Sequence, residues 1–400
     1  MISATSRPYI DASVPVLREH GLAITQTFYR NLFASHPELT NLFNMGNQAN
    51  GSQQQSLAGA VFAYAANIDN LEALGPVVSR IVQKHASVGI TAAHYPIVGR
   101  HLIGAIQEVL GDAATPPLLA AWDEAYNSLA NLFIAAEKEL YAQAGIVAGQ
   151  LHAMRIIEKR NESADVISFT MQTMSGNAVP KFKPGQYISV AVDFDENRRQ
   201  LRQYSLSDAP NSDWLRISVK REVETKTPAG AVSNWLHDNV EVGSIINITH
   251  PFGDFLPDTE SNEPVVLLSA GVGITPMMSA LKHIVKINPN RRVIFAHAAQ
   301  SQEHHAHQDE IKAAKMVMPH LQTVKFYEAA HDMKNADVGA LHGRMEIEKL
   351  PKWPRAETNV YMCGPSPFMK AQWLGLIAAG TPVARLHREV FGPDLLGDLS

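Results

Sequence analysis

The chain has 400 residues, of which 46% are hydrophobic and 18% charged, and its net charge is −5. This length exceeds what one hydrophobic core usually holds, so two or three domains are expected. The acidic balance argues against a nucleic-acid partner or an anionic membrane attracted by bulk charge. Because Cys363 is the only cysteine, the sequence excludes a disulfide framework and a Cys-rich metal site, as in a reducing cytoplasm.

Residues 1–145 predict an all-helical domain. Apolar residues recur at three- and four-residue steps, and Val78, Ile81 and Val82 form such a stripe. His85 falls on the same stripe. A histidine there is either a core residue satisfied by a neighbour or a metal ligand on the inner helix face, and the local pattern leaves both interpretations open.

The pattern changes near Leu151. Short β-branched, alternating runs at 187–192, 215–220 and 244–249 are separated by Gly, Pro, Asn and Asp. Such spacing predicts an antiparallel β-barrel or sandwich.

From Pro264 onward, compact apolar runs alternate with helical segments, which indicates a parallel α/β sheet. The uncharged stretch 265–281 contains Gly271, Gly273 and Pro276. We therefore expect a buried strand, a tight turn and a helix start there, not a membrane span. The N-terminal MISATSRPYI has no apolar core of the signal-peptide type.

Three motifs in the middle region suit a flavin nucleotide. In RQYSLSD, residues 202–208, alternation puts Arg202 and Tyr204 on one face of a strand. A guanidinium can clamp a pyrophosphate and a tyrosine ring can lie against a flat heterocycle, although an ordinary sheet strand has the same pattern. PGQY (184–187) precedes this motif, and GAVSNWLH (230–237) follows it with a helix start suited to phosphate.

The last region carries three further motifs. SAGVGITPMM (269–278) follows a strand, and its glycines let the backbone approach a pyrophosphate, although Pro276 stands at the third glycine position of the G-x-G-x-x-G fingerprint. YMCGPSPFM (361–369) and EVFGPD (389–394) come later in the chain.

In their order along the chain these motifs resemble the FAD and nicotinamide domains of the ferredoxin–NADP reductase superfamily. The resemblance implies FAD contacts from Tyr187, Arg202, Gln203, Tyr204, Ser205, Gly230, Val232, Ser233, Phe391, Gly392 and Pro393. It implies NAD(P) contacts from Gly271, Val272, Gly273, Ile274, Thr275, Pro276, Cys363, Gly364 and Pro365. The sequence leaves NADH and NADPH open; HAAQSQ, which lacks an arginine for a 2′-phosphate, leans weakly towards NADH.

The helical region, too, resembles a known domain. The order Tyr29, Phe43, Gln53, Leu57, His85, together with NLFNM, QKHAS and HYPIVGRHL, is similar to the globin domain of bacterial and fungal flavohaemoglobins. With the FAD and NAD motifs, this resemblance covers nearly the whole chain.

The family's fold is then expected here: a globin (haem b) domain at 1–145, an antiparallel β-barrel FAD domain at 146–262, and a parallel-sheet α/β NAD(P)H domain of ferredoxin reductase type at 263–400. His85 would be the proximal haem iron ligand. Tyr95 and Glu137 would orient its ring, although Tyr95 could be a packing residue and Glu137 a solvated charge. The distal pocket would carry Tyr29 and Gln53, lined by Phe43, Leu57 and Leu102.

The resemblance implies nitric oxide dioxygenation for NO detoxification: NAD(P)H electrons pass through FAD to haem iron, whose bound O2 converts NO to nitrate. Expected partners are O2, NO and NAD(P)H, with a lipid in the haem pocket also allowed, and the chain is expected to be a monomer. One alternative is an oxygen sensor or storage protein kept ferrous by its own reductase. Another is a flavin reductase whose helical domain binds lipid.

Some segments depart from the family pattern. The linker reads VAGQLHAMR, the loop EVETKTPAG (222–230) is longer than usual, and Arg388 stands where an aromatic residue is common. EHHAH (303–307) could hold a metal, but we expect a solvated helix start whose histidines need no partner.

Overall fold

The structure is a computed structural model that describes residues 2–68, 70, 74–211, 213–223, 229–329 and 339–393. The chain packs as two units: Met1–Leu151 with Ala191–Arg202, and His152–Val190 with Gln203–Ser400.

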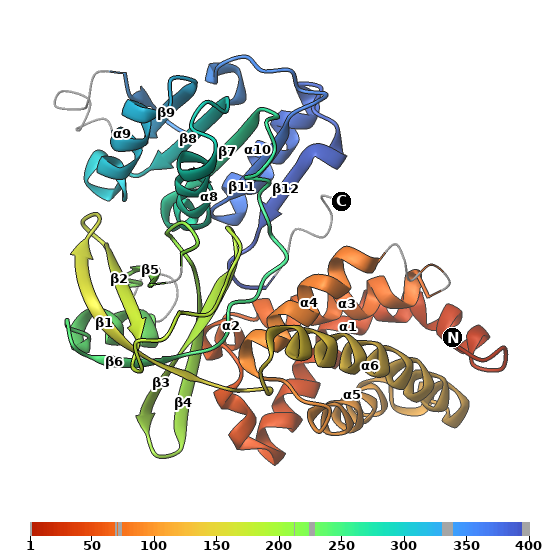
Figure 1. The fold of residues 1–400 in the computed structure, drawn as a ribbon. Coiled ribbons are helices and arrows are strands. Elements are labelled where there is room, and N and C mark those ends of the chain that lie inside the picture. The colour runs from red at the N-terminus through yellow and green to blue at the C-terminus, as the bar shows by residue number, and fades with distance from the viewer. Residues whose placement is uncertain are drawn as a thin grey trace. The chain divides into compact units, whose positions relative to one another are not determined.

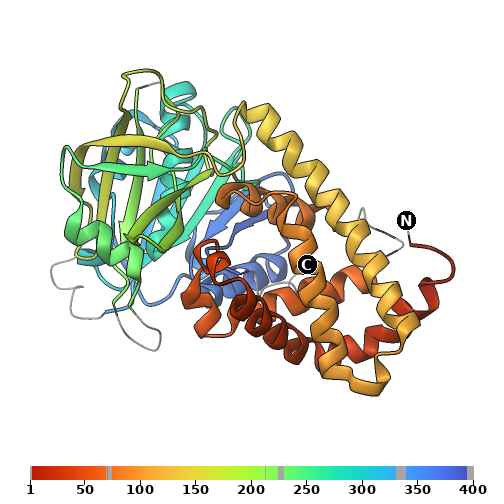
Figure 2. The same cartoon turned by 90° about the horizontal axis from the view of Figure 1, so that it is seen from below.

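As predicted for residues 1–145, the regular secondary structure in the described part of this region is all helical. The helices are α1 (Arg7–Ser35), α2 (Met45–Ala49), α3 (Ser52–Ala66), α4 (Gly75–Val88), α5 (His94–Leu110) and α6 (Pro116–Ala144), with 3-10 turns at Pro37–Asn41 and Gly111–Ala113. Figure 2 shows α5, in orange, beside α6, in gold.

Apolar spacing explains how these helices pack. On α1, Ile10, Leu17 and Ile24 are buried at seven-residue steps, and Phe28 continues the stripe against α3 and α5. Each such side chain contributes roughly 1.5–3 kcal/mol on burial. Helix α4 ends at Gly89 in the left-handed conformation, where a Cβ would press on the backbone of Gly149. The atypical linker therefore passes over the end of the helix that carries His85.

An antiparallel sheet follows, as predicted. Its strands are β1 (His152–Asn161), β2 (Val166–Thr173), β3 (Tyr187–Asp195), β4 (Arg198–Ser205), β5 (Leu215–Lys220) and β6 (Ile245–Ile248), in the order β4-β3-β6-β1-β2-β5. A bridge between Leu206, just past β4, and Ile217 of β5 joins the two ends of that order, as in a barrel. Helix α7 (Ala231–Asn239) lies between β5 and β6 in the chain.

The C-terminal region forms the predicted parallel α/β sheet (Figure 1). Its order is β10-β9-β8-β7-β11-β12, with β7 (Val265–Ala270), β8 (Val293–Ala299), β9 (Leu321–Tyr327), β10 (Leu341–His342), β11 (Asn359–Cys363) and β12 (Leu386–Glu389). Helices α8 (Ile274–Ile287) and α9 (Gln308–Val317) cover one face and α10 (Ser366–Ala378) the other.

The uncharged stretch 265–281 divides as expected into β7, a 3-10 turn at Gly271–Gly273 and the start of α8. Among the helices that the structure describes, none has the length and apolar character needed to span a bilayer.

A buried charged cluster ties the antiparallel sheet to the parallel one. Arg216 of β5 donates to both carboxylate oxygens of Glu310 on α9, at 2.6 and 2.9 Å, and Lys282 of α8 reaches Glu310 at 3.0 Å. Burial raises the pKa of Glu310, but the bonds from His307 and Arg216 outweigh it and leave that pKa well below its usual value. The carboxylate is therefore charged at neutral pH.

Candidate functional site

Two hydrogen-bond donors converge on one buried carboxylate behind His85. The Nδ1–H of His85 lies 2.8 Å from Glu137 Oε1 and the Tyr95 hydroxyl donates to the same oxygen at 2.5 Å. His85 Nδ1 is also 3.1 Å from the Tyr95 hydroxyl. Glu137 is 2% exposed, which rules out the solvated charge considered above. Since its chain neighbours Lys138 and Glu139 are exposed, helical phase alone turns this carboxylate inward.

The carboxylate also controls the neighbouring phenol. Burial and the adjacent Glu137 raise the pKa of Tyr95 far above its ordinary value, so Tyr95 remains a neutral donor. Tyr126 donates its hydroxyl to the Tyr95 main-chain carbonyl at 2.7 Å, and Gly99 leaves room for the Tyr126 ring, which any Cβ there would strike. The first turn of α5 is thereby held against α6.

A second group of predicted residues centres on Tyr29 of α1. The ring is 4% exposed and lies edge-on to Phe43, with centroids 5.7 Å apart. Burial raises the pKa of the Tyr29 phenol to about 12, against the opposing effect of two hydrogen-bonding amides, those of Gln53 and Gln48. Sequence reasoning identified Gln53 and missed Gln48, a half-buried polar residue on the five-residue helix α2.

The residues around His85 fit a haem. Its side chain is 34% exposed although its helix neighbours Val82 and Ala86 are buried. Because both hydrogen bonds of the ring use Nδ1, Nε2 is the nitrogen left to meet iron, and a carboxylate-held imidazole is the usual arrangement for a metal ligand. Phe43 and Leu57 belong to the apolar core yet are only partly buried, as residues against a large flat apolar group would be. Leu102 is 6% exposed and lines a small apolar cavity between α1, α3 and α5.

The RQYSLSD and PGQY motifs lie against each other. The Leu206 N–H donates to the Gln186 carbonyl at 3.0 Å, which joins the end of RQYSLSD to PGQY. Tyr187 exchanges both main-chain hydrogen bonds with Phe252, at 2.8 and 2.9 Å, and Gly253 lies under its ring. Along β4, Arg202 and Tyr204 are half-buried while the intervening Gln203 is exposed, as strand alternation requires.

The predicted helix start is present. Gly230 is the N-cap of α7, and Val232 and Ser233 are buried in its first turn. The Ser233 hydroxyl donates to the Gly230 carbonyl at 3.2 Å and accepts from the main-chain N–H of Glu222. The described ends of the long loop 222–230 are therefore fastened to the helix start; residues 224–228 lie outside the described part of the chain. Ser205 is 5% exposed at the end of β4.

The glycine turn and the C-G-P element meet at the carboxyl ends of adjacent strands. Ser269 of β7 pairs with Cys363 of β11, and Cys363 pairs in turn with Glu389 of β12. Space allows no side chain at Gly273, where a Cβ would strike the Cys363 carbonyl, while a Cβ on Gly271 would meet nothing within 4 Å. This open glycine turn before α8 fits a pyrophosphate, because main-chain N–H groups and the helix dipole face it.

Other residues that were predicted to contact NAD(P) come directly after the glycine turn. Val272, Ile274, Thr275 and Pro276 continue it into α8, where the Thr275 hydroxyl donates back to the Val272 carbonyl at 3.0 Å. Burial and the neighbouring Glu389 raise the pKa of the Cys363 thiol, which therefore stays neutral.

The other residues of the C-terminal motifs are more exposed to solvent. Gly364 and Pro365 lead into α10, and Phe391 is 45% exposed, followed by Gly392 and Pro393 at the end of the described residues. Asp394 of the EVFGPD motif lies outside them. Arg388 places its guanidinium 5.2 Å from the centre of the Trp373 ring, so a cation–π contact occupies the position where an aromatic residue is common.

The EHHAH segment was wrongly predicted to be a solvated helix start. His305 and His307 are each 1% exposed. His305 Nδ1 lies 2.9 Å from the Tyr327 hydroxyl, and His307 lies between Ser218 of β5 (3.0 Å) and Glu310 (3.0 Å). Ser218 and Tyr327 come from distant strands, which local pattern could not reveal. No group of metal-ligating side chains is found at this segment or elsewhere among the described residues.

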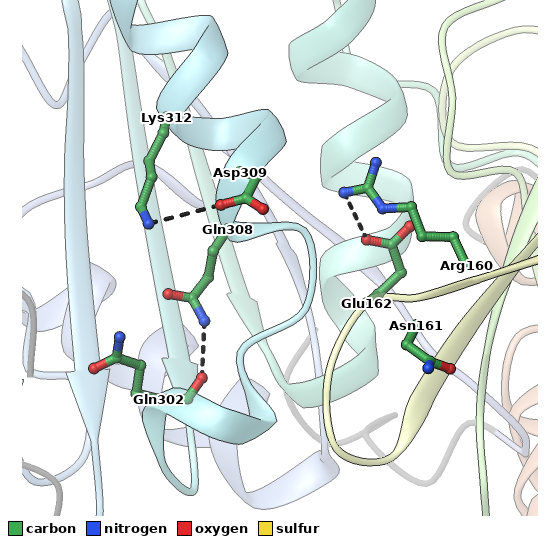
Figure 3. Close-up of a pocket in the computed structure, with 7 residues that line it drawn as sticks. All are labelled: Arg160, Asn161, Glu162, Gln302, Gln308, Asp309 and Lys312. Carbon is green, nitrogen blue, oxygen red and sulfur yellow. Dashed lines mark hydrogen bonds and ion pairs between the residues drawn. The ribbon is translucent and has the colours of Figure 1, made fainter.

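A polar cavity of about 410 Å³ opens beside this segment (Figure 3). Its lining consists of Arg160, Asn161, Glu162, Gln302, Gln308, Asp309 and Lys312. None of the predicted site residues lines it, and its charged side chains pair along its two walls, Arg160 with Glu162 and Lys312 with Asp309.

Comparison with known proteins agrees with this organisation. Family models match at residues 26–132 (Globin), 153–256 (Oxidoreductase FAD-binding domain) and 267–373 (Oxidoreductase NAD-binding domain). The chain is 43% identical to the "Flavohemoprotein" of Rhizobium meliloti over 405 residues, covering 100% of both.

Solved structures are similar as well. The flavohemoglobin of Malassezia yamatoensis, whose structure contains bound FAD and heme, superposes with a TM-score of 0.85 at 28% identity over 98% of this chain and all of the other. The FAD/NAD-binding domain of a nitric oxide dioxygenase from Vibrio cholerae gives 0.55 at 36% identity over 60% of this chain and 99% of its own.

A globin domain followed by FAD- and NAD-binding oxidoreductase domains defines a haem oxidoreductase driven by a nicotinamide. Similarity over the full length to the relatives above decides which family of such proteins the chain belongs to. The chain belongs to the flavohaemoglobin (flavohemoprotein) family.

Proposed function

We propose that this protein is a nitric oxide dioxygenase that uses haem b, FAD and NADH or NADPH to convert NO and O2 to nitrate. The observation that carries the proposal is the His85–Glu137–Tyr95 arrangement, in which a buried carboxylate accepts a hydrogen bond from the Nδ1–H of the histidine. Such a bond makes an imidazole a stronger donor to iron and favours oxygen activation over storage. A nitric oxide dioxygenase of Vibrio cholerae has FAD and NAD domains similar to those of this chain.

On the distal side, Tyr29 is proposed to hydrogen-bond the haem ligand, with Gln53 beside it. The raised pKa of the phenol, about 12, keeps it protonated and able to donate at any physiological pH. A buried neutral donor stabilises negative charge that develops on a ligand more strongly than a solvated one. The aromatic ring of Phe43 and the side chain of Leu57 exclude water from this side.

When bound, haem supplies the metal centre for O2 chemistry and FAD converts a two-electron hydride donor into a source of single electrons. Arg202 and the α7 start at Gly230 are proposed to hold the FAD phosphates, with Tyr204 against the ring. The glycine turn at 271–273 would hold the nicotinamide pyrophosphate. Cys363 and Glu389 end neighbouring strands beside it, and the neutral thiol presents no charge to the nicotinamide.

We further propose domain limits of 1–145, 146–262 and 263–400 for the haem, FAD and NAD(P)H domains, and a monomeric protein. Unit 2 of the structure joins most of the last two, consistent with a single reductase module.

The test is aerobic NO consumption by purified, haem- and FAD-loaded protein with NADH. The expected result is nitrate formed in a one-to-one ratio with NO, and haem reduced when NADH is added without oxygen. Haem reduction without NO consumption would leave an oxygen-binding protein with its own reductase. Flavin without haem would contradict the role of His85.

A further inference from the structure

Gln48, which the sequence analysis did not identify, belongs to a partly buried network of side-chain amides. Gln54 of α3 directs its Nε2 at two acceptors of Gln48, the main-chain carbonyl at 3.2 Å and the side-chain Oε1 at 2.9 Å. A main-chain carbonyl can only accept, so Gln54 must present its amide nitrogen to it. Gln48 must then present its oxygen to the same nitrogen. The orientation of both amides is fixed by the backbone.

In this orientation the oxygen of the Gln48 amide, and not its Nε2, faces Gln54. The Nε2 is buried and has no hydrogen-bond partner in the described part of the chain, and the Gln48 amide is one of the two amides that lower the pKa of the buried Tyr29 phenol. A buried donor without an acceptor is costly, at roughly 1–3 kcal/mol, so an interaction with the phenol oxygen is favoured.

Helix α1 holds this network of amides in place. The Thr25 hydroxyl donates to the Gln54 main-chain carbonyl at 3.0 Å, one turn before Tyr29 on the same helix. The Asn44 side chain caps α2 by accepting from the Gly46 N–H at 3.0 Å, which fixes the short helix that carries Gln48.

We propose that Gln48, oriented by Gln54, is a positioning residue that donates a hydrogen bond to the Tyr29 hydroxyl oxygen and so turns the phenol proton towards the ligand side of the haem. A phenol has one proton to donate and lone pairs to accept, so a donor behind its oxygen removes the orientations in which the proton points away. This inference rests on the proposed function, because it assigns Gln48 to the distal donor of that reaction.

The test uses two variants and a matched control in the haem-loaded full-length protein. Gln48→Leu removes the donor, Gln54→Leu removes the group that orients it, and Gln55→Leu changes an exposed glutamine of the same helix α3. The readout is the O2 dissociation rate of the reduced protein. Loss of one neutral hydrogen bond acting through Tyr29 is expected to raise that rate about 3- to 10-fold in Gln48→Leu, less in Gln54→Leu, and not in Gln55→Leu.

The decisive comparison repeats Gln48→Leu in the Tyr29→Phe background. A residue that acts only through the phenol has no further effect there. The proposal is overturned if Gln48→Leu leaves O2 dissociation unchanged, or if it accelerates dissociation equally with and without the phenol. Should Gln48→Leu fail to retain haem, the same comparison with Gln54→Leu decides, since that variant keeps Gln48 but frees its amide.

These outcomes are separate from NO turnover. A rise in O2 dissociation without any NO consumption in the parent protein would refute the dioxygenase and leave the role of Gln48 intact. Normal NO turnover with unchanged O2 dissociation in Gln48→Leu would do the reverse.

Discussion

Replacement of Glu137 by glutamine tests the proximal arrangement most directly. The substitution keeps the shape of the side chain but removes the charge that accepts from both His85 and Tyr95. A hydrogen bond to a charged group contributes about 1.5–3 kcal/mol and a neutral one about 0.5–1.5 kcal/mol, so the bond to His85 loses roughly 1–1.5 kcal/mol. The oxidised iron loses more than the reduced iron, because the electron-rich imidazole favours the higher charge.

For a one-electron couple, tenfold in the equilibrium constant corresponds to about 59 mV, so the loss predicts a rise in the haem midpoint potential of up to about 40–65 mV, reached when the oxidised state bears all of it. The assay is a spectroelectrochemical titration that follows the haem Soret band, with the flavin band as an internal reference. Glu139→Gln is the matched control, since Glu139 is exposed on the same helix and accepts from Gln143 at 2.8 Å. A change smaller than that of the control, or a fall in potential, would refute the reasoning.

Three further predictions concern the other parts of the chain. Tyr29→Phe is expected to speed O2 dissociation by at least about tenfold and to lower NO turnover with haem content unchanged; stopped-flow measurements that show unaltered dissociation would remove its role. Gly273→Ala, which forces a Cβ against the Cys363 carbonyl, should slow flavin reduction by NADH while FAD remains bound, whereas Gly104→Ala, in open space on α5, should not. Burial lowers the pKa of His297 to about 3. Between about pH 6.5 and 3 the unfolded chain then binds one more proton than the folded chain. The free energy of unfolding, measured in urea, should therefore decrease as the pH is lowered through this range, by up to roughly 1.4 kcal/mol per pH unit, and His297→Gln should reduce that dependence.

Much of the fold can be predicted from the spacing of apolar residues, glycines and prolines along the sequence. The stretch 265–281 contains a run of apolar residues, two glycines and a proline, and these predict the strand, turn and helix that the structure has there. The run LRISVK matches β5 residue for residue. Such signals are local, because a strand or helix of the right period buries its own apolar face.

Contacts between distant segments could not be predicted this way. His305 and His307 look solvated in sequence because nothing near them is apolar enough to bury them, and their partners lie on β5 and β9. Gln48 is one polar residue among several in MGNQANGSQQQ, and only the direction of the Gln54 amide separates it from its neighbours. Resemblance to a family identifies the residues of known motifs and is silent on such supporting groups.

The charged cluster at Glu310 determines how this protein can be dissected. A cut between residues 262 and 263 follows the change in sequence pattern, but it would part Arg216 from Glu310. Glu310 would keep Lys282 and His307, whereas the buried Arg216 would lose the carboxylate to which it is bonded. Removing one member of a buried ion pair typically costs 3–5 kcal/mol, a large share of a domain's stability. Chimaeras that exchange the nicotinamide domain alone should therefore express poorly unless β5 and α9 come from the same parent.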